Sequence, residues 1–345
     1  MARKITKETN AGKEFLQTLK ELAYEKGIDE ELLFETIEAA LISAYRRNFG
    51  SAQNVRIALS RETGAFHVFA IKTVVEEAES GVTDISLAQA HAINPDYQVG
   101  DVVEIEMTPA NFGRIAAQTA KQVVMQRLRE AERGIVYEAY MNRSADIVTG
   151  IVQRIEGRSV YVDIGKAEAV LMPTEQIPGE TYNYGDTIRA YIIEVKRSPR
   201  GPQIMLSRTH PGLLKKLFEL QVPEMQEGIV EIKAIVREAG SRSKVAVHST
   251  EERVDPIGAC VGPHFMRVQA VVDELAGEKI DIVKWSEDPA TYIANSLNPA
   301  KVISVAVSET EKLSRVVVPD YQLSLAIGKE GQNARLAAKL TGWKI

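Results

Sequence analysis

One stretch of this 345-residue chain occurs twice, and that internal repeat constrains the fold more than any other feature. Residues 259–280 read ACVGPHFMRVQAVVDELAGEKI, and residues 325–345 read LAIGKEGQNARLAAKLTGWKI. The offset is 66 residues between the first glycines, Gly262 and Gly328, and 65 at the last residues. Around each copy the apolar pattern predicts a helix, two strands, two helices and a strand. We therefore predict two copies of one fold that lie side by side and form one continuous surface.

The second copy places two glycines where a helix would otherwise continue, and an Ala- and Leu-rich helical pattern follows them. In a helix–GxxG–helix turn, backbone N–H groups and the helix dipole attract a phosphate, and glycine lets a sugar-phosphate chain approach closely. A lone GxxG is more often an ordinary turn, but the duplicated context favours RNA binding. This is the logic of a KH domain, whose GxxG loop holds about four nucleotides of single-stranded nucleic acid. The predicted RNA-binding residues of this copy are Gly328, Lys329, Glu330, Gly331, Asn333 and Arg335.

The first copy departs from this pattern at its second glycine. Its loop reads Gly262-Pro263-His264-Phe265, so a phenylalanine stands where a phosphate would approach. Either this copy grips the RNA backbone weakly, or the Phe265 ring stacks on a base instead, and we expect the weaker grip. The residues of this copy that we predict to contact RNA are Gly262, Pro263, His264 and Arg267.

Residues 147–208 consist of short β-rich runs with glycine turns between them. About five strands fit in this length, which is typical of a small closed barrel of the OB type. Such barrels bind RNA through exposed aromatic and basic residues on their central strands. The basic side chains that could supply phosphate contacts here are Lys196, Arg197, Arg200 and Arg208.

The first third of the chain is acidic. Residues 1–146 hold 17 Lys and Arg against 22 Asp and Glu, which accounts for the whole net charge of −5. Two helices are predicted within residues 10–49, with Asp29 as the cap of the second. A hairpin that turns at residues 62–64, a further strand and a long helix over residues 111–143 follow. An acidic surface is a poor site for RNA and suits the docking of a protein.

The sequence predicts neither an enzyme nor a membrane protein. The five histidines lack metal-ligand spacing, and there is no Walker loop and no GxSxG motif, so we predict no metal and no cofactor. Phosphorolytic exoribonucleases also carry KH and OB modules, but on a large catalytic body that has no counterpart here. No apolar run is long enough to span a membrane, and the first residues lack the apolar core of a signal peptide. The single cysteine, Cys260, cannot form an internal disulfide, which fits a reducing, cytoplasmic location.

Four motifs carry a resemblance that covers nearly the whole chain. They are FGRIAAQTAKQVV, VDPIGACVG, GEKIDIV and AIGKEGQNARLAAKLTGW. On these motifs the chain resembles the NusA family of bacterial transcription elongation, termination and antitermination factors. The resemblance implies an α+β multidomain protein with an N-terminal α+β domain, an OB-type β-barrel of the S1 class and two tandem type II KH domains. The expected boundaries are 1–140, 141–209, 210–283 and 284–345, and the last strand of the second KH domain is expected to be truncated.

The resemblance also implies a function. NusA-like N-terminal domains bind RNA polymerase at the flap region of its β subunit, and the S1 and KH domains hold nascent single-stranded RNA. Such factors promote pausing and intrinsic termination, and they join antitermination complexes with other Nus factors. A free-standing RNA chaperone or translation factor is the rival interpretation, and the N-terminal motif argues against it. The long helix predicted over residues 111–143 carries four basic residues: Arg114, Lys121, Arg127 and Arg129. They form either a solvated helix face or a contact with polymerase or with RNA that emerges from it.

The same resemblance singles out residues on the barrel. Tyr161 occupies an aromatic position expected from relatives, whereas Arg158 stands where another aromatic is frequent and Met172 where histidine is frequent. Tyr161 belongs either to an RNA-binding platform or to the core. The two departures favour weak, sequence-tolerant RNA binding over tight recognition.

Overall fold

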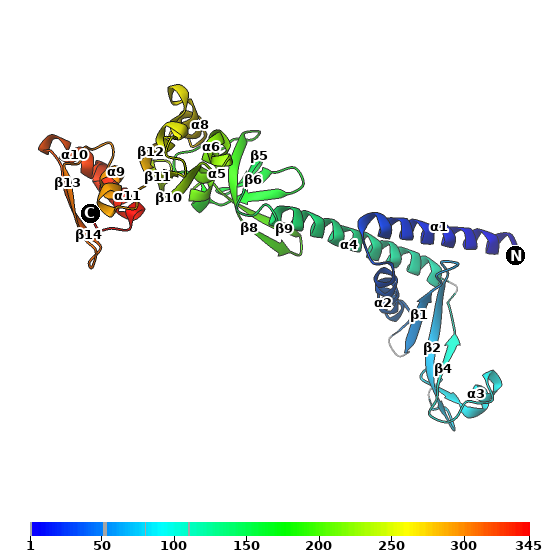
Figure 1. Cartoon of the computed structure of the whole chain (residues 1–345). Coiled ribbons are helices and arrows are strands. Elements are labelled where there is room, and N and C mark those ends of the chain that lie inside the picture. Colours follow the sequence, from blue (N-terminus) through cyan, green and yellow to red (C-terminus); the bar gives the residue numbers. More distant parts are fainter. Residues whose placement is uncertain (1, 51–53, 80, 110) are drawn as a thin grey trace. The chain divides into compact units, whose positions relative to one another are not determined.

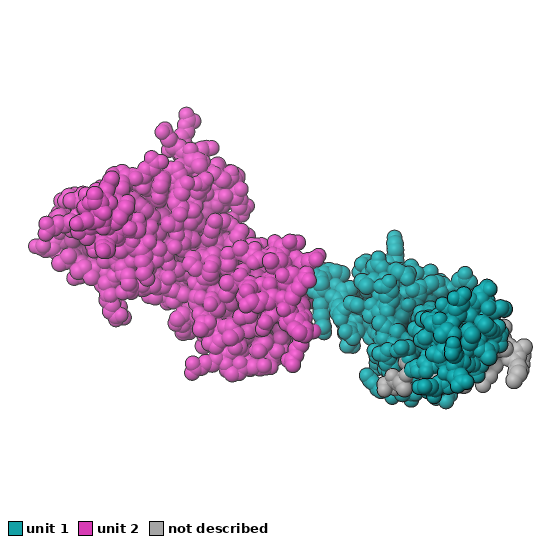
Figure 2. All heavy atoms as spheres, turned by 90° about the horizontal axis from the view of Figure 1, so that it is seen from below, with its two compact units in different colours: residues 1–135 teal, residues 136–345 magenta. Residues whose placement is uncertain are grey.

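The computed structural model describes residues 2–50, 54–79, 81–109 and 111–345, with side chains from residue 13 onward (Figure 1). The chain divides into two compact units, residues 1–135 and 136–345, which are teal and magenta in Figure 2. The boundary between them falls within helix α4 (Phe112–Met141).

The N-terminal unit combines two helices with a small mixed sheet, as the change from a helical to an alternating apolar pattern predicts. Strand β2 is the centre of the sheet, because β1 and β4 pair with it antiparallel and β3 pairs with it parallel. The predicted hairpin joins β1 to β2, whereas the short β3–α3 segment was not predicted. The elements before α4 are α1 (Ala2–Lys26), α2 (Glu30–Phe49), β1 (Val55–Leu59), β2 (Phe66–Val75), β3 (Asp84–Ser86), α3 (Leu87–Ile93) and β4 (Val102–Glu106).

The core of this unit forms where α1, α2 and the start of α4 pack against the sheet. Asp29 caps α2 as predicted, because its Oδ1 accepts a hydrogen bond from Leu32 N at 2.8 Å. Apolar residues at helical spacing meet alternating residues of the strands. The buried side chains are Leu16, Leu19, Ala23, Leu33, Phe34, Ile37, Leu41, Tyr45, Val55, Ile57, Leu59, Val68, Phe112, Ala116 and Ala120.

The C-terminal unit contains a closed five-stranded barrel, which confirms the OB-type prediction. The strands follow the order β5-β6-β7-β9-β8, with β7 and β9 parallel. Val160 and Val162 point into the barrel, so Tyr161 between them points outward. The strands are β5 (Ile147–Glu156), β6 (Ser159–Asp163), β7 (Glu168–Leu171), β8 (Thr187–Ser198) and β9 (Gly201–Ser207).

The first KH copy is built on a three-stranded sheet with β11 at its centre. β10 pairs with β11 antiparallel, and β12 pairs with β11 parallel. Val245 and Val247 of β11 face the helices of this copy, whereas Ala246 faces the opposite side. The elements are α5 (Pro211–Gln221), α6 (Pro223–Gln226), β10 (Val230–Glu238), β11 (Arg242–Ser249), α7 (Pro256–Val261), α8 (Met266–Glu274) and β12 (Lys279–Lys284).

The second KH copy repeats this order with a smaller sheet, in which β13 and β14 pair antiparallel. Lys344 forms a single parallel bridge with Leu313, and its N–H donates to Lys312 O at 2.8 Å. This bridge lies where the last strand is predicted to begin, and it matches the parallel pairing of β11 with β12. The elements are α9 (Pro289–Ser296), β13 (Ser304–Ser308), β14 (Leu313–Val317), α10 (Leu323–Ile327) and α11 (Gln332–Thr341).

Helices of the second copy cover the outer face of the sheet of the first copy. Ala246 and Val283 of the first copy form one buried cluster with Tyr292 of α9 and Leu340 of α11. Both faces of β11 are therefore buried, which explains why Val245, Ala246 and Val247 follow one another without a polar residue. The predicted repeat is confirmed, and its two copies pack directly on each other.

Candidate nucleic-acid interface

The two glycines of the second copy serve different purposes in the turn between α10 and α11. Gly328 has φ +76° and ψ 173°, and a Cβ there would lie 2.8 Å from Asn333 N. A larger residue at this position would collide with the backbone of α11. Gly331 also has φ +76°, but a Cβ there meets no atom within 4 Å. Gly328 thus lets the turn pack closely against α11, whereas Gly331 leaves open space on the solvent side of the turn.

The turn offers a site for an anion. No side chain caps the N-terminus of α11, and the N–H groups of Gly331 and Gln332 donate within the turn to Gly328 O and Lys329 O. These two amides are therefore not free donors, and an anion is attracted by the positive end of the helix dipole. Lys329 is exposed beside it, and Glu330 is exposed with a left-handed φ of +54°. This arrangement has the shape and the charge to hold a phosphate of a nucleic-acid backbone.

Asn333 is directed into the protein, contrary to its predicted role in RNA binding. Its side chain is 2% exposed, and Nδ2 donates to Leu297 O at 2.9 Å. The same nitrogen donates to Leu325 O and Ala326 O, both at 3.2 Å. These bonds join α11 to α10 and to the end of α9. We therefore assign Asn333 a structural role, because its amide braces the turn from behind.

Helix α11 also carries polar contacts between the two KH copies. Arg335 Nε donates to Glu238 Oε1 of β10 at 2.9 Å, and Gln332 Nε2 donates to Glu238 Oε2 at 2.8 Å. Gln332 reaches Ser241 Oγ as well, at 2.7 Å. The hydrogen bonds from Arg335 and Gln332 hold the pKa of Glu238 below its usual range. Arg335 is still 46% exposed in this ion pair, so its guanidinium remains accessible to RNA.

A cleft of about 500 Å³ lies between this turn and the first copy. Both copies bring cations to it, namely Lys329 from the turn, Arg242 from β11 and Lys279 from β12. Arg242 is paired with Asp281 at 2.7 Å, whereas Lys279 is exposed. No sequence pattern predicted Arg242 or Lys279 as part of the site, because only the packing of the two copies brings them to the turn.

The loop of the first copy has the same backbone conformation as the loop of the second. Gly262, with φ +74° and ψ 174°, matches Gly328. Phe265, with φ +63° and ψ 13°, matches Gly331, with φ +76° and ψ 14°. A left-handed backbone costs a residue with a Cβ about 1 kcal/mol, so Phe265 adopts a conformation that glycine would take freely.

Arg267 occupies the position that Asn333 has in the second copy, and it too braces its own loop. A Cβ at Gly262 would lie 2.5 Å from Arg267 Cγ. Arg267 Nη1 donates to Glu224 Oε2 at 2.8 Å and to Ala259 O at 2.6 Å. We therefore assign Arg267 a structural role, and because its side chain is still 24% exposed the RNA contact stays a prediction. The other predicted residues of this loop are exposed at its tip: Pro263 and His264.

On the barrel, the outward side chain of Tyr161 is covered by Arg154. The guanidinium lies 3.9 Å from the ring centroid, and it also pairs with two glutamates. Tyr161 is half-buried in this stack and lies outside the barrel core, which excludes the core alternative. Three of the predicted basic residues of the barrel are exposed: Arg158, Lys196 and Arg200.

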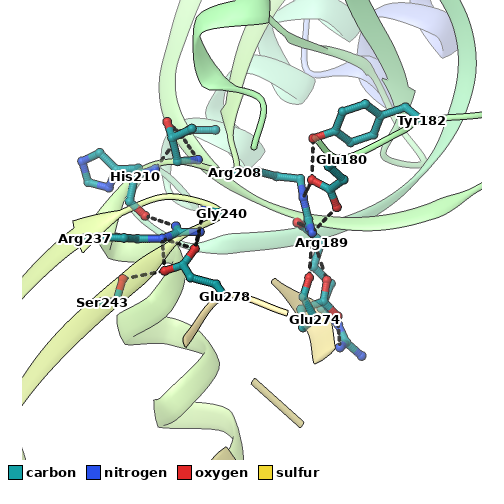
Figure 3. Close-up of polar contacts among 12 residues, drawn as sticks. Glu180, Tyr182, Arg189, Arg208, His210, Arg237, Gly240, Ser243, Glu274 and Glu278 are labelled. Atoms are coloured by element: carbon teal, nitrogen blue, oxygen red, sulfur yellow. Dashed lines mark hydrogen bonds and ion pairs between the residues drawn. The ribbon is translucent and has the colours of Figure 1, made fainter. Parts of the chain in front are cut away.

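Arg208 is not a surface cation, contrary to the prediction. It is 2% exposed and lies between the barrel and the first KH copy (Figure 3). Its guanidinium donates to Glu180 of the barrel at 2.6 and 2.8 Å and to Glu274 at the end of α8 at 3.2 Å. Burial raises the pKa of Tyr182, whose hydroxyl donates to Glu180 at 2.6 Å. A buried arginine requires such partners, so Arg208 joins the barrel to the KH copy and is not available to a phosphate.

A second buried ion pair shapes the first copy where it borders the cleft. Arg237 and Glu278 have no exposed side-chain surface, and Arg237 Nη2 lies 2.9 Å from Glu278 Oε2 (Figure 3). Glu278 also accepts hydrogen bonds from Gly240 N at 3.0 Å and from Ser243 Oγ at 2.5 Å. This network fixes the turn between β10 and β11, which forms one wall of the cleft.

The basic residues predicted on α4 do not all face solvent. Arg127 donates to Thr36 Oγ1 at 3.0 Å and pairs with Glu130 at 3.1 Å, so it holds α4 on α2 within the N-terminal unit. The two interpretations of this helix face stay open for the other three. These are exposed: Arg114, Lys121 and Arg129.

Four family models match the chain in the predicted order. They describe a NusA N-terminal domain (residues 14–134), an S1 RNA binding domain (143–207), a NusA-like first KH domain (208–285) and a NusA-like second KH domain (289–345). A protein from Halalkalibacterium halodurans is 62% identical over 96% of this chain and 87% of its own length. A protein from Bacillus subtilis is 60% identical over 96% of this chain and 90% of its own length. Both are named transcription termination/antitermination protein NusA.

The chain belongs to the NusA family. This confirms the resemblance and the fold class, an α+β multidomain chain with an S1 barrel and two KH domains. A solution structure of the N-terminal domain of NusA from Bacillus subtilis is 61% identical and covers 35% of this chain and 98% of that one, with a TM-score of 0.33. In the described part of this NusA-family chain, no helix has the length and apolar character of a membrane span. The same residues contain no group of three or more His, Cys, Asp or Glu placed to bind a metal.

Proposed function

We propose that this chain binds RNA polymerase through its N-terminal domain and holds nascent single-stranded RNA with its S1 and KH domains. In this way it modulates pausing, intrinsic termination and antitermination, as a cytoplasmic binding factor that catalyses no reaction and uses no cofactor. We place the domains at residues 1–140, 141–209, 210–283 and 284–345. The observation that carries the RNA-binding part is the turn at residues 328–331, where two glycines precede a helix N-terminus without a side-chain cap.

The RNA backbone is expected to cross the open side of this turn. There a phosphate meets the N-terminus of α11 and the Lys329 ammonium, and Arg335 lies one helical turn further on. The cleft of about 500 Å³ and the exposed Lys279 extend the site toward the first copy. Because the chain as a whole is acidic, binding depends on shape and a few local cations, and it weakens as salt is added.

The N-terminal domain suits a protein partner better than RNA. Residues 1–146 hold the entire negative net charge, which would repel a transcript. We propose RNA polymerase, at the flap region of its β subunit, as the partner of this domain, and other Nus factors as partners in antitermination complexes. On the barrel, Tyr161 and Arg154 add a weak and sequence-tolerant contact to the same RNA.

The substitution Gly331→Asp tests the RNA-binding part. A carboxylate would stand in the open space before the turn and repel the phosphate. We expect the affinity of the full chain for a labelled single-stranded oligoribonucleotide, measured by fluorescence anisotropy, to fall at least about 10-fold.

A matched control is available at the other end of α11. Gly342 has φ +75°, and a Cβ there also meets no atom within 4 Å. Gly342→Asp therefore adds the same charge under the same backbone strain, and it should change RNA affinity less than about 2-fold. Unchanged affinity of Gly331→Asp, with the fold verified by circular dichroism, would contradict the proposed grip.

The polymerase contact is tested with tagged residues 1–140 and tagged residues 141–345. The first fragment should retain the β subunit from purified RNA polymerase, and the second should not do so without a transcript. If neither fragment nor the full chain retains polymerase while RNA binding is intact, a free-standing RNA chaperone becomes the better explanation.

A further inference from the structure

The two KH loops share one backbone conformation but present different side chains to solvent. Phe265 of the first loop has the conformation of Gly331 in the second. Around Gly331 the protein leaves the space in front of the turn empty, because a Cβ there meets no atom within 4 Å. In the first loop the Phe265 side chain extends into the corresponding space, where it is 68% exposed.

Phe265 does not stabilise the fold, either through its exposed ring or through its backbone conformation. A ring that lies mostly in solvent buries little apolar surface. The left-handed φ of +63° is unfavourable for a residue with a side chain. Met266, which is 67% exposed, extends the same apolar tip. A strained and exposed aromatic residue at the place of a ligand contact points to a function in binding.

The first loop also lacks the charges that suit a phosphate. Pro263 stands in the place of Lys329, and Gln269 stands in the place of Arg335. The cation of this loop, Arg267, is paired with a glutamate at 2.8 Å. An uncharged surface is therefore the better partner for the tip. The flat face of a nucleobase is such a surface, and an aromatic ring stacks on it with little dependence on sequence.

We propose that the Phe265 ring stacks on a nucleobase of the single-stranded RNA that the KH pair holds. The first copy then contacts RNA through a base, whereas the second contacts it through a backbone phosphate. This inference rests on the proposed function, because it requires RNA on the KH pair. A protein partner at the same tip is the competing explanation. RNA is favoured because the loop keeps the KH backbone and a helix α8 whose N-terminus has no side-chain cap.

Variants of the full chain test the stacking with an oligoribonucleotide of about 12 nucleotides that carries 2-aminopurine at one position at a time. At one position, stacking on Phe265 should quench the fluorescence. Phe265→Leu keeps an apolar side chain without the ring, so it should abolish this quenching and weaken affinity at least about 5-fold. Phe265→Trp keeps a stacking surface and should bind within about 2-fold of the parent chain. Tyr24→Leu is the matched control, because it removes an exposed aromatic ring from α1 in the N-terminal unit, and it should change neither readout.

Gly331→Asp separates failure of this inference from failure of the proposed function. If Gly331→Asp weakens binding and Phe265→Leu does not, stacking is overturned while the grip of the second copy stands. If neither variant weakens binding, the KH pair does not hold RNA and both proposals fail. Tighter binding by Phe265→Gly would show that the ring obstructs the loop, which also overturns stacking. Loss of polymerase retention by Phe265→Leu, with RNA affinity intact, would assign the tip to a protein partner.

Discussion

The loops at residues 262–265 and 328–331 follow the same backbone path but differ at every position after the first glycine. In both loops the first glycine packs against the second residue of the following helix, which is Arg267 in one copy and Asn333 in the other. The interior of each copy therefore determines the shape of the turn. The exposed positions determine what the turn can bind.

The bracing residues show how different side chains can perform one structural task. Asn333 donates a hydrogen bond to Leu325 O, and Arg267 donates one to Ala259 O. These two carbonyl groups occupy matching positions of the internal repeat. An amide and a guanidinium thus tie the second helix of each pair to the same point on the first.

The largest loss of stability is expected when a Cβ is added to Gly328, the first glycine of the second loop. Gly328→Ala would bring the new atom within 2.8 Å of Asn333 N and would also strain a φ of +76°, so we expect a loss of about 2–4 kcal/mol. Gly331→Ala strains the backbone alone and should cost about 1 kcal/mol. Hydrogen exchange of the amides of α11 would measure both losses. Equal effects of the two substitutions would break the distinction between the two glycines.

An intermediate effect is expected from removing the brace. Asn333→Ala leaves the carbonyl groups of Leu297 and Leu325 without their buried donor, and it should destabilise the second copy by about 1–3 kcal/mol. Arg267→Ala removes a less buried brace and should cost the first copy about 1 kcal/mol. Hydrogen exchange of the amides of α11 and of α8 would compare the two losses of stability. A larger loss in the first copy would reverse the ranking of the two braces.

The smallest effect is expected from the polar contact between the copies. Glu238→Gln removes an ion pair whose Arg335 side chain is 46% exposed, so it should cost about 0.5 kcal/mol. The pKa of Glu238 is lowered in the folded protein, mainly by the hydrogen bond from Arg335. Its contribution is therefore present above the pKa of the unfolded state and is lost as the pH falls through the lower folded value. Urea titrations from about pH 3 to pH 7 should show this loss in the parent chain and not in Glu238→Gln.

The sequence predicted much of the fold because the signals involved are local. The cap at Asp29 and the alternation of residues in the barrel strands depend on neighbours in the chain, and the repeat is found by comparing the sequence with itself. The conformation of the turn could also be foreseen at Gly328, where glycine precedes a helical pattern. The short β3–α3 segment was missed, because three strand residues before a helix carry too little periodicity to be recognised.

The site predictions that were wrong or incomplete concern side chains whose neighbours lie far away in the sequence. Arg208 follows the last barrel strand and resembles a surface cation, but the first KH copy covers it. Asn333 lies beside the glycine turn in sequence, but its place on the inner face of α11 follows from the contact with α10. Lys279 joins the candidate site only through packing of the two copies. Such placements cannot be read from spacing along one chain.

Crosslinking of RNA to the full chain tests the central claim most directly, namely that one backbone shape contacts RNA in two different ways. A single-stranded oligoribonucleotide with photoreactive 4-thiouridine would be irradiated on the protein, and the modified peptides would be identified by mass spectrometry. We predict crosslinks in both loops, at Phe265 in the first and within residues 328–331 in the second. Crosslinks confined to the barrel or to residues 1–140, with neither loop modified, would contradict the account.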